Sequence, residues 1–140
     1  MKHIYIIINL ILAISLSAGA GDIQLKINDI TAEWGGDIRI GLYQEAGFPT
    51  EGKAIQGWVL QVTDISADFT INDIPEGVYA IAIFQDINTD GKLNRTIYRA
   101  PKEPYAFSNN KFGRFGPPKF SEVSFSVKNG EVSSLTINLE

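Results

Sequence analysis

Short runs in which apolar and polar residues alternate recur along the chain, with turn residues between them. A period of two residues is typical of half-buried strands, whereas no segment after residue 20 keeps the apolar period of a helix. Because an alternating sheet needs a second apolar face to cover it, we expect an all-β fold. Seven to eight strands would form a single antiparallel β-sandwich of the immunoglobulin-like type. The expected strands cover residues 23–27, 38–42, 58–62, 69–71, 78–84, 123–127 and 135–139.

Two turn signals predict which strands pair. The glycine pair at 35–36 lies between the runs 23–27 and 38–42, which we expect to be neighbours in one sheet. Asn-Gly at 129–130 is the strongest hairpin signal in the chain. It predicts a terminal hairpin between the last two runs.

The run 78–84 differs from the others because it is apolar on both faces. Such a strand is typical of the centre of a sheet that is covered on both sides, so we expect it to be the central strand. A turn at 74–77 precedes it. In that turn Pro75 fixes φ, and we expect Gly77 to take a positive φ.

The start of the chain is typical of a cleavable export signal. A basic residue and the only histidine precede a thirteen-residue, mainly apolar run, and small residues follow. The run is too short to span a bilayer comfortably, and Ala18 and Ala20 fit cleavage before Gly21. We therefore expect residues 1–20 to be a signal peptide and 21–140 to be the β-sandwich domain of a periplasmic or secreted protein.

The residue inventory limits the chemistry of the exported chain. Without the leader it has no histidine and no cysteine, and it carries eleven basic and sixteen acidic residues. This excludes Ser-His-Asp triads, cysteine nucleophiles, thiolate or imidazole metal sites, haem ligation and iron–sulfur clusters. A net charge near −5 also makes nucleic acid an unexpected partner. The inventory favours a protein without catalytic activity.

A stretch directly after the central run resembles the first half of a calcium loop, with oxygen-bearing side chains at alternate positions and Gly91 at the sixth. The candidate ligands are Asp86, Asn88, Asp90, Lys92 (through its backbone carbonyl) and Asn94. Ile97 stands where a bidentate glutamate would belong, so calcium would bind weakly, with Kd of about 10⁻⁴ to 10⁻³ M, unless Glu103 completes the shell. The alternative is that these side chains make Asx-turns that close the loop without metal.

The segment 95–119 combines positive charge with aromatic rings. It holds six basic residues against one acid, Glu103, and prolines and glycines interrupt it. Its aromatic content predicts a long ordered loop over the sandwich. Its side chains would suit an anionic or planar ligand; alternatively, the rings seal one end of the core and the basic residues contact solvent. The candidate ligand-binding residues are Arg95, Arg99, Tyr105, Phe107, Asn109, Asn110 and Arg114.

Four motifs in series carry a family resemblance: residues 74–80, 86–94, 101–110 and 116–122. Their order and spacing resemble those of the small exported bacterial proteins that form the domain of unknown function 2141 family. The resemblance implies a transthyretin-like or carboxypeptidase-regulatory-like β-sandwich. It implies no established activity.

Three functions compete on this sequence. The first is an exported, non-catalytic binding or accessory module whose partner is a small molecule, a glycan or an envelope protein. The second is a hydrolase, for example of glycans, in which Asp86 or Asp90 forms a carboxylate pair with Glu103. The third is a structural envelope subunit that pairs through an edge strand, either the first strand or the terminal hairpin. We expect no membrane span once the leader is removed.

Overall fold

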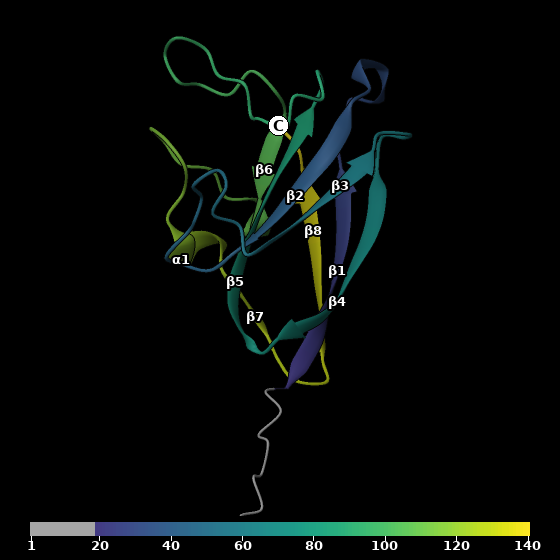
Figure 1. Ribbon diagram of the computed structural model, residues 1–140, viewed down its shortest axis with the longest axis vertical. Helices are drawn as coiled ribbons and strands as arrows, with labels where there is room; N and C mark the ends of the chain where they lie inside the picture. Colours follow the sequence, from purple (N-terminus) through teal and green to yellow (C-terminus); the bar gives the residue numbers. More distant parts are fainter. Residues whose placement is uncertain (1–18) are drawn as a thin grey trace, which may run out of the picture.

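The computed structural model describes residues 19–140, so the predicted signal peptide lies almost wholly outside the described residues. Within residues 19–140, eight strands form two sheets that lie face to face, and the predicted all-β sandwich is confirmed (Figure 1). The strands are β1 (Ala20–Asn28), β2 (Asp37–Tyr43), β3 (Gln56–Gln61), β4 (Ala67–Pro75), β5 (Gly77–Asp86), β6 (Tyr105–Phe107), β7 (Phe125–Val127) and β8 (Val132–Asn138). The short helical turns are η1 (Ala32–Trp34), η2 (Ser108–Asn110) and α1 (Phe120–Val123).

The two sheets enclose one apolar core. One sheet has the order β4-β1-β8, and the other has the order β3-β2-β5-β6 with β7 also paired to β5. The pairs are antiparallel except β1 with β8, which run parallel. Fully buried side chains from both sheets meet between them. They include Ile23, Leu25, Ile27, Ile38, Leu42, Ile74, Ile81 and Ile137.

The expected pairing of 23–27 with 38–42 is wrong. β1 lies between β4 and β8, and β2 lies between β3 and β5 in the other sheet. The turn glycines carry the chain from one sheet to the other with φ values of 64° and 79°. A Cβ on Gly36 would come within 2.2 Å of the Asp86 carbonyl oxygen, so only glycine fits there. β1 is therefore internal and is not an exposed edge. β8, which belongs to the other segment that the edge-pairing hypothesis named, does lie at the edge of its sheet.

The predicted terminal hairpin is also wrong. β7 pairs with β5 and β8 pairs with β1, so the two strands lie in different sheets. The turn itself is present, because the Glu131 N–H donates to the Lys128 carbonyl at 3.1 Å and Gly130 has a φ of 72°. The Asn-Gly turn reverses the chain without pairing the strands that it connects.

The prediction that 78–84 forms the central strand is confirmed. β5 pairs with β2, β6 and β7. On its inner face Ile81 and Ile83 lie in the core, and on its outer face Ala80 is fully buried with Phe107 and Val123. β5 is therefore buried on its inner face and covered in part on its outer face, where Phe107 of β6 and Val123 of α1 pack on Ala80 while Val78 is 52% exposed.

Gly77 does not take the positive φ predicted for it. It leaves room for the ring of Tyr79, whose atoms a Cβ at Gly77 would approach to 3.3 Å. The Tyr79 hydroxyl donates to the carbonyl of Pro75 at 2.7 Å, an arrangement like the tyrosine corner of other sandwiches. Burial raises the pKa of Tyr79.

The segment 95–119 is less irregular than expected because it contains β6, which pairs with β5. Tyr105 and Glu140 exchange two backbone hydrogen bonds of 3.0 and 3.1 Å, so the end of the chain ties β6 to the other sheet. Within residues 19–140, no helix is long and apolar enough to cross a membrane.

Candidate functional site

A hollow lies on the outer face of the larger sheet, where three small residues stand side by side. Gly41 of β2 pairs with Gly57 of β3 and with Ala82 of β5. All three occupy positions on the outer face of the sheet, because the side chains on either side of Gly41 along β2, Ile40 and Leu42, point into the core. A row without large side chains leaves a depression in the face of the sheet.

Larger side chains form the walls of this outer-face cavity, which has a volume of about 260 Å³. Arg39, Phe84 and Tyr105 lie in the next row across β2, β5 and β6. Phe107 ends the row of small residues beside Ala82, and Tyr43 stands on the other side of Gly41 along β2. Loops complete the lining with Pro49, Glu51, Gly52, Ala54, Gly91, Leu93, Arg95 and Pro117.

A buried carboxylate holds Arg39 in the wall of the cavity. The Nε of Arg39 donates to Oδ2 of Asp86 at 2.5 Å; the Asp86 side chain is fully buried, whereas 29% of the Arg39 side chain is exposed. Asp86 also accepts the backbone N–H groups of Asp90 at 3.2 Å and Gly91 at 2.8 Å. The guanidinium lies over Gly91, where a Cβ would be 3.6 Å from Cζ of Arg39. The loop after β5 therefore fixes the arginine.

Asp90 organises the outer half of the same loop. Its Oδ2 accepts the side-chain amides of Asn94 at 2.9 Å and Asn88 at 3.1 Å, and its Oδ1 accepts the Lys92 N–H at 2.9 Å. Hydrogen bonds to a carboxylate favour its charged form. The pKa of Asp90 is accordingly lowered, chiefly by the amide of Asn94 and next by the N–H of Lys92.

Glu103 closes the inner half of the loop. Its two carboxylate oxygens accept the backbone N–H groups of Ile87 and Asn94, each at 3.0 Å, and only 7% of the residue is exposed. Neither Glu103 nor Asp86 lines the cavity. The arrangement gives no support to the carboxylate-pair hydrolase, because the oxygens of both side chains accept hydrogen bonds from backbone N–H groups of this loop.

The loop is thus closed by its own N–H groups and by the guanidinium of Arg39. In residues 19–140 the structure shows no group of three or more acidic or histidine side chains placed to hold a metal ion. One oxygen in this part of the chain, Oδ1 of Asn94, is buried without a hydrogen-bond partner. The contacts favour the Asx-turn alternative, in which Arg39 provides the positive charge at Asp86. Calcium binding stays a prediction.

Three of the predicted ligand-binding residues line the cavity: Arg95, Tyr105 and Phe107. The two rings also contact each other edge to face, with centroids 5.9 Å apart, and both contact Phe112. The rings therefore cover part of the outer face of β5 and also form a wall of the cavity. Ligand binding by this segment stays a prediction.

Asn109 and Asn110 serve the fold. The side-chain amide of Asn109 donates to the Ser124 carbonyl at 3.0 Å. Asn110 donates to the Thr136 carbonyl at 2.9 Å and accepts the N–H of Asn138 at 2.8 Å. These bonds hold η2 against the chain on either side of it. Neither residue lines the cavity.

Arg99 and Arg114 are exposed and also lie outside the lining of the cavity. The carbonyl of Arg99 accepts Nη1 of Arg95 at 3.1 Å. The guanidinium of Arg114 lies 5.8 Å from the centre of the Phe115 ring. The set of ligand-binding residues predicted from the sequence thus combines residues that line the cavity with residues on an exposed surface.

Sequence reasoning missed Arg39, Tyr43, Glu51 and Phe84, all of which line the cavity. Burial raises the pKa of Tyr43, and the carboxylate of Glu51 raises it further. The available signal was the set of small residues at outward positions of three strands. That signal becomes visible only once the register of the strands is known.

Comparison with family models matches residues 25–134 to the family described as "Uncharacterized protein conserved in bacteria (DUF2141)". The chain belongs to this family. The match runs from β1 into β8, so the DUF2141 region contains the whole cavity and the loop after β5. Comparisons with curated proteins and with solved structures gave no match. The family resemblance is confirmed, and the narrower transthyretin-like description of the sandwich stays a prediction.

Proposed function

We propose that this DUF2141 protein is a non-catalytic binding module for a small, largely apolar ligand with one anionic group. The proposal rests on the row of Gly57, Gly41 and Ala82, which lies between aromatic walls and beside a guanidinium. Concave, mainly apolar sites with a few polar groups are typical of small-molecule binding. A volume of about 260 Å³ lies just below the usual range of roughly 300–1,000 Å³ for such sites and favours a compact ligand.

Arg39 is the reason for proposing an anionic group. Its Nε is committed to Asp86, and within residues 19–140 its two terminal nitrogens have no hydrogen-bond partner. A guanidinium held at Nε offers its remaining N–H groups in one plane, which matches a carboxylate. Asp86 balances the charge of Arg39, and Arg95, whose Nη1 donates to a backbone carbonyl, is the second cation of the lining.

The opposite end of the cavity sets the length of the ligand. Tyr43 and Glu51 line that end, and Tyr43 lies four residues along β2 from Arg39, roughly 13 Å between Cα atoms. The apolar body of the ligand would lie over Gly41 and Ala82. Its anionic group would lie at Arg39, away from the carboxylate of Glu51.

The substitution Gly57→Val tests the cavity. A Cβ at Gly57 meets only the Ile40 carbonyl oxygen, at an ordinary 3.4 Å, and valine suits a strand, so the fold should tolerate the change while the cavity is filled. Gln61→Val is the matched control, because it adds the same side chain to the same face of β3 outside the lining.

The probe for this test is 3-phenylpropanoate, measured by isothermal titration calorimetry. We expect a Kd on the order of 1 mM for the parent protein, weakened at least about tenfold by Gly57→Val and unchanged by Gln61→Val. Equal weakening by both substitutions would contradict the proposal. So would a failure of the parent protein to bind any of a panel of apolar carboxylates of similar size.

Export is part of the same proposal and rests on the first twenty residues. We expect the protein recovered from the periplasm or the medium to begin at Gly21, which intact-mass measurement decides. The structure adds a consequence, because the carbonyls of Gly19 and Ala20 accept the N–H groups of Glu76 and Gly130 at 2.8 and 2.9 Å. Cleavage before Gly21 would remove these two bonds. A mature protein that begins at Gly19 or earlier would contradict the expected cleavage site.

A further inference from the structure

Two exposed loop apices carry apolar side chains next to arginines. The first apex is the turn at residues 96–99, in which the Arg99 N–H donates to the Thr96 carbonyl at 2.9 Å. A further bond of 2.8 Å, from the Thr96 N–H to the Ala100 carbonyl, closes the loop below it. Ile97 and Tyr98 are the central residues of the turn, and 89% and 87% of them are exposed.

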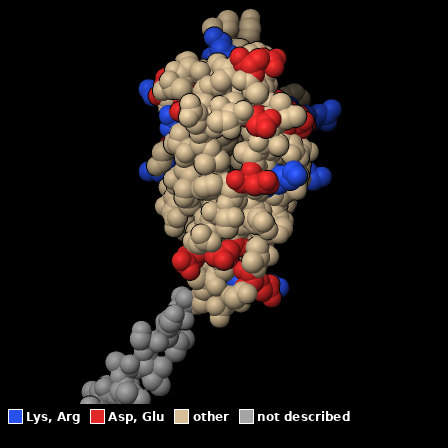
Figure 2. Space-filling view, turned by 90° about the vertical axis from the view of Figure 1, so that its right-hand side faces the viewer, with Lys and Arg blue, Asp and Glu red and all other residues tan. Residues whose placement is uncertain are grey.

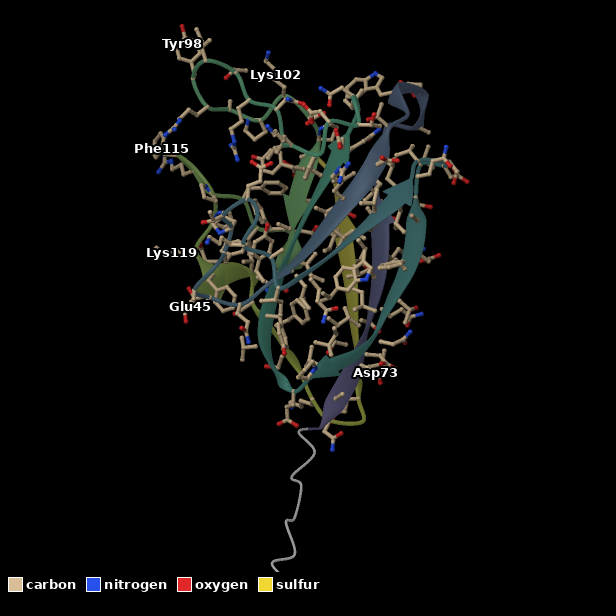
Figure 3. The ribbon with its side chains drawn as sticks, in the orientation of Figure 1. Glu45, Asp73, Tyr98, Lys102, Phe115 and Lys119 are labelled. Carbon is tan, nitrogen blue, oxygen red and sulfur yellow. The ribbon has the colours of Figure 1, made fainter. Side chains whose placement is uncertain are left out.

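The second apex is residues 113–116. A Cβ on Gly113 would come within 1.8 Å of the Gly116 carbonyl oxygen, so only glycine allows this close approach of the chain to itself. The approach leaves Arg114 and Phe115 at the tip, with 97% of Phe115 exposed. Figure 3 shows Tyr98 and Phe115 directed away from the sandwich on its upper left.

Basic residues flank these two apices along the chain. The segment 95–119 contains one acid, Glu103, and its carboxylate is buried and hydrogen-bonded to backbone N–H groups. The basic side chains of the segment are Arg95, Arg99, Lys102, Lys111, Arg114 and Lys119. In contrast, the rest of residues 21–140 holds fifteen Asp and Glu against five Lys and Arg. On the side of β3 and β4, acidic side chains lie over the middle of the face and basic ones mainly near its edges (Figure 2). The molecule is therefore electrically polarised.

Turn apices are ordinarily occupied by glycine, proline and small polar residues, so large apolar side chains at two of them need a reason. A protein partner requires a broad complementary patch, about 800 Å² on each side. A lipid surface requires only a few side chains at the depth of the headgroups, and tyrosine and phenylalanine with flanking arginines are typical of that depth. Positive charge attracts such a segment to anionic lipids.

We propose that the protein docks reversibly on an anionic lipid surface through the apices 96–99 and 113–116. Ile97, Tyr98 and Phe115 enter the interface, and the surrounding basic residues contact anionic headgroups. Arg95 and Pro117, which line the cavity, lie next to these two apices in the chain. Docking would therefore hold the cavity near the membrane surface.

Sedimentation with lipid vesicles tests this proposal. The protein, with the same N-terminus in every variant, is mixed with vesicles of phosphatidylcholine alone or with about 30% phosphatidylglycerol. We expect binding to the anionic vesicles only, and its loss at about 0.5 M NaCl, where charges are screened within a few ångströms. Equal binding to both vesicles, or no binding at low salt, would overturn the proposal.

The variant Tyr98→Ser/Phe115→Ser should bind the anionic vesicles roughly tenfold more weakly. Val59→Ser/Ile65→Ser is the matched control, because these side chains are 53% and 66% exposed outside the apices. The control should bind like the parent protein. Equal loss in both variants, or none in the first, would show that the apices are not the docking surface. A soluble protein partner that needs Tyr98 and Phe115, with no binding to vesicles, would show that the apices bind protein and would overturn the proposed lipid surface. Circular dichroism of each variant checks the fold.

Discussion

At the scale of single residues, the pair of Arg39 and Asp86 links the fold to the proposed site. The sequence identified Asp86 from its place in a calcium-like motif, but it did not identify its partner, which lies 47 positions earlier. Strand register brings the two together, because Arg39 stands opposite Phe84 in β5, two residues before Asp86. A sequence motif shows which side chains offer oxygens. It does not show whether those oxygens bind a metal ion or a basic side chain.

Ser108 gives a direct test of the buried polar contacts that hold the outer layer. Its hydroxyl accepts the Ile81 N–H at 3.0 Å and donates to the Val123 carbonyl at 2.5 Å. Ser108→Ala would leave a buried N–H unpaired, so we expect the free energy of unfolding to fall by about 1–3 kcal/mol in urea. Ser126→Ala, at an exposed serine, is the control. A change of stability no larger than in the control would refute this account.

The lowered pKa of Asp90 predicts a dependence of stability on pH. A carboxyl whose pKa is lower in the folded protein stabilises the fold above its unfolded pKa, 3.8, and this contribution is lost as pH falls through the folded value. Urea unfolding midpoints should therefore fall less between pH 5 and pH 2 in Asp90→Asn than in the parent protein. Asp68→Asn, on the exposed side of β4, serves as the control and should behave like the parent. Parallel curves for Asp90→Asn and the parent would contradict the prediction.

At the scale of elements, the loop after β5 predicts how the protein responds to calcium. Arg39 and backbone N–H groups already satisfy the carboxylates of Asp86 and Glu103. Calcium at about 10 mM should therefore shift Tm by less than about two degrees relative to EDTA. A Kd of about 0.1 mM would instead stabilise the fold by roughly 2.7 kcal/mol, a shift on the order of ten degrees. A shift of that size that Asp90→Ala abolishes would show that the loop is a calcium site.

Seven of the eight strands in residues 19–140 were predictable from sequence, whereas β6 lies in a segment predicted as a loop and the pairing of the strands was not predicted. Alternation at 23–27, 38–42 and 58–62 reflects which side chains face the core, and that local property survives in the fold. The turns at 35–36 and 129–130 reverse the chain through residues with positive φ, but the same turn chemistry serves a hairpin and a crossing between sheets. Only the packing of the whole sandwich decides between the two.

The cavity was invisible in the sequence for the same reason. Its floor comes from three strands whose small residues lie far apart along the chain and meet only through register. Tyr105 and Phe107 were recognised because aromatic residues cluster in one segment, whereas Asn109 and Asn110 were recognised for their polarity and prove to bind backbone groups. Composition identified the neighbourhood of the site but not its residues.

At the scale of the whole molecule, the larger sheet uses its two faces differently. The inner face packs against the smaller sheet and gives the fold its core. The outer face carries aromatic clusters, the cavity and the basic apices, so the proposed functions gather on one layer of the protein. Substitutions on the outer face at Gly57 should therefore alter binding without lowering stability, unlike changes in the core.

The measurement that tests the cavity most directly is a ¹H–¹⁵N correlation spectrum of the protein titrated with 3-phenylpropanoate. Glycine amide signals are useful reporters here, because four glycines line the cavity and others lie elsewhere. The lining glycines are Gly41, Gly52, Gly57 and Gly91; Gly77 and Gly130 are controls. The account predicts that the amide signals of the lining glycines shift saturably with the acid and shift less with its neutral amide. The signals of the two control glycines should not shift. Shifts spread over all glycines, or confined to those outside the lining, would contradict a ligand site on the outer face of the sheet.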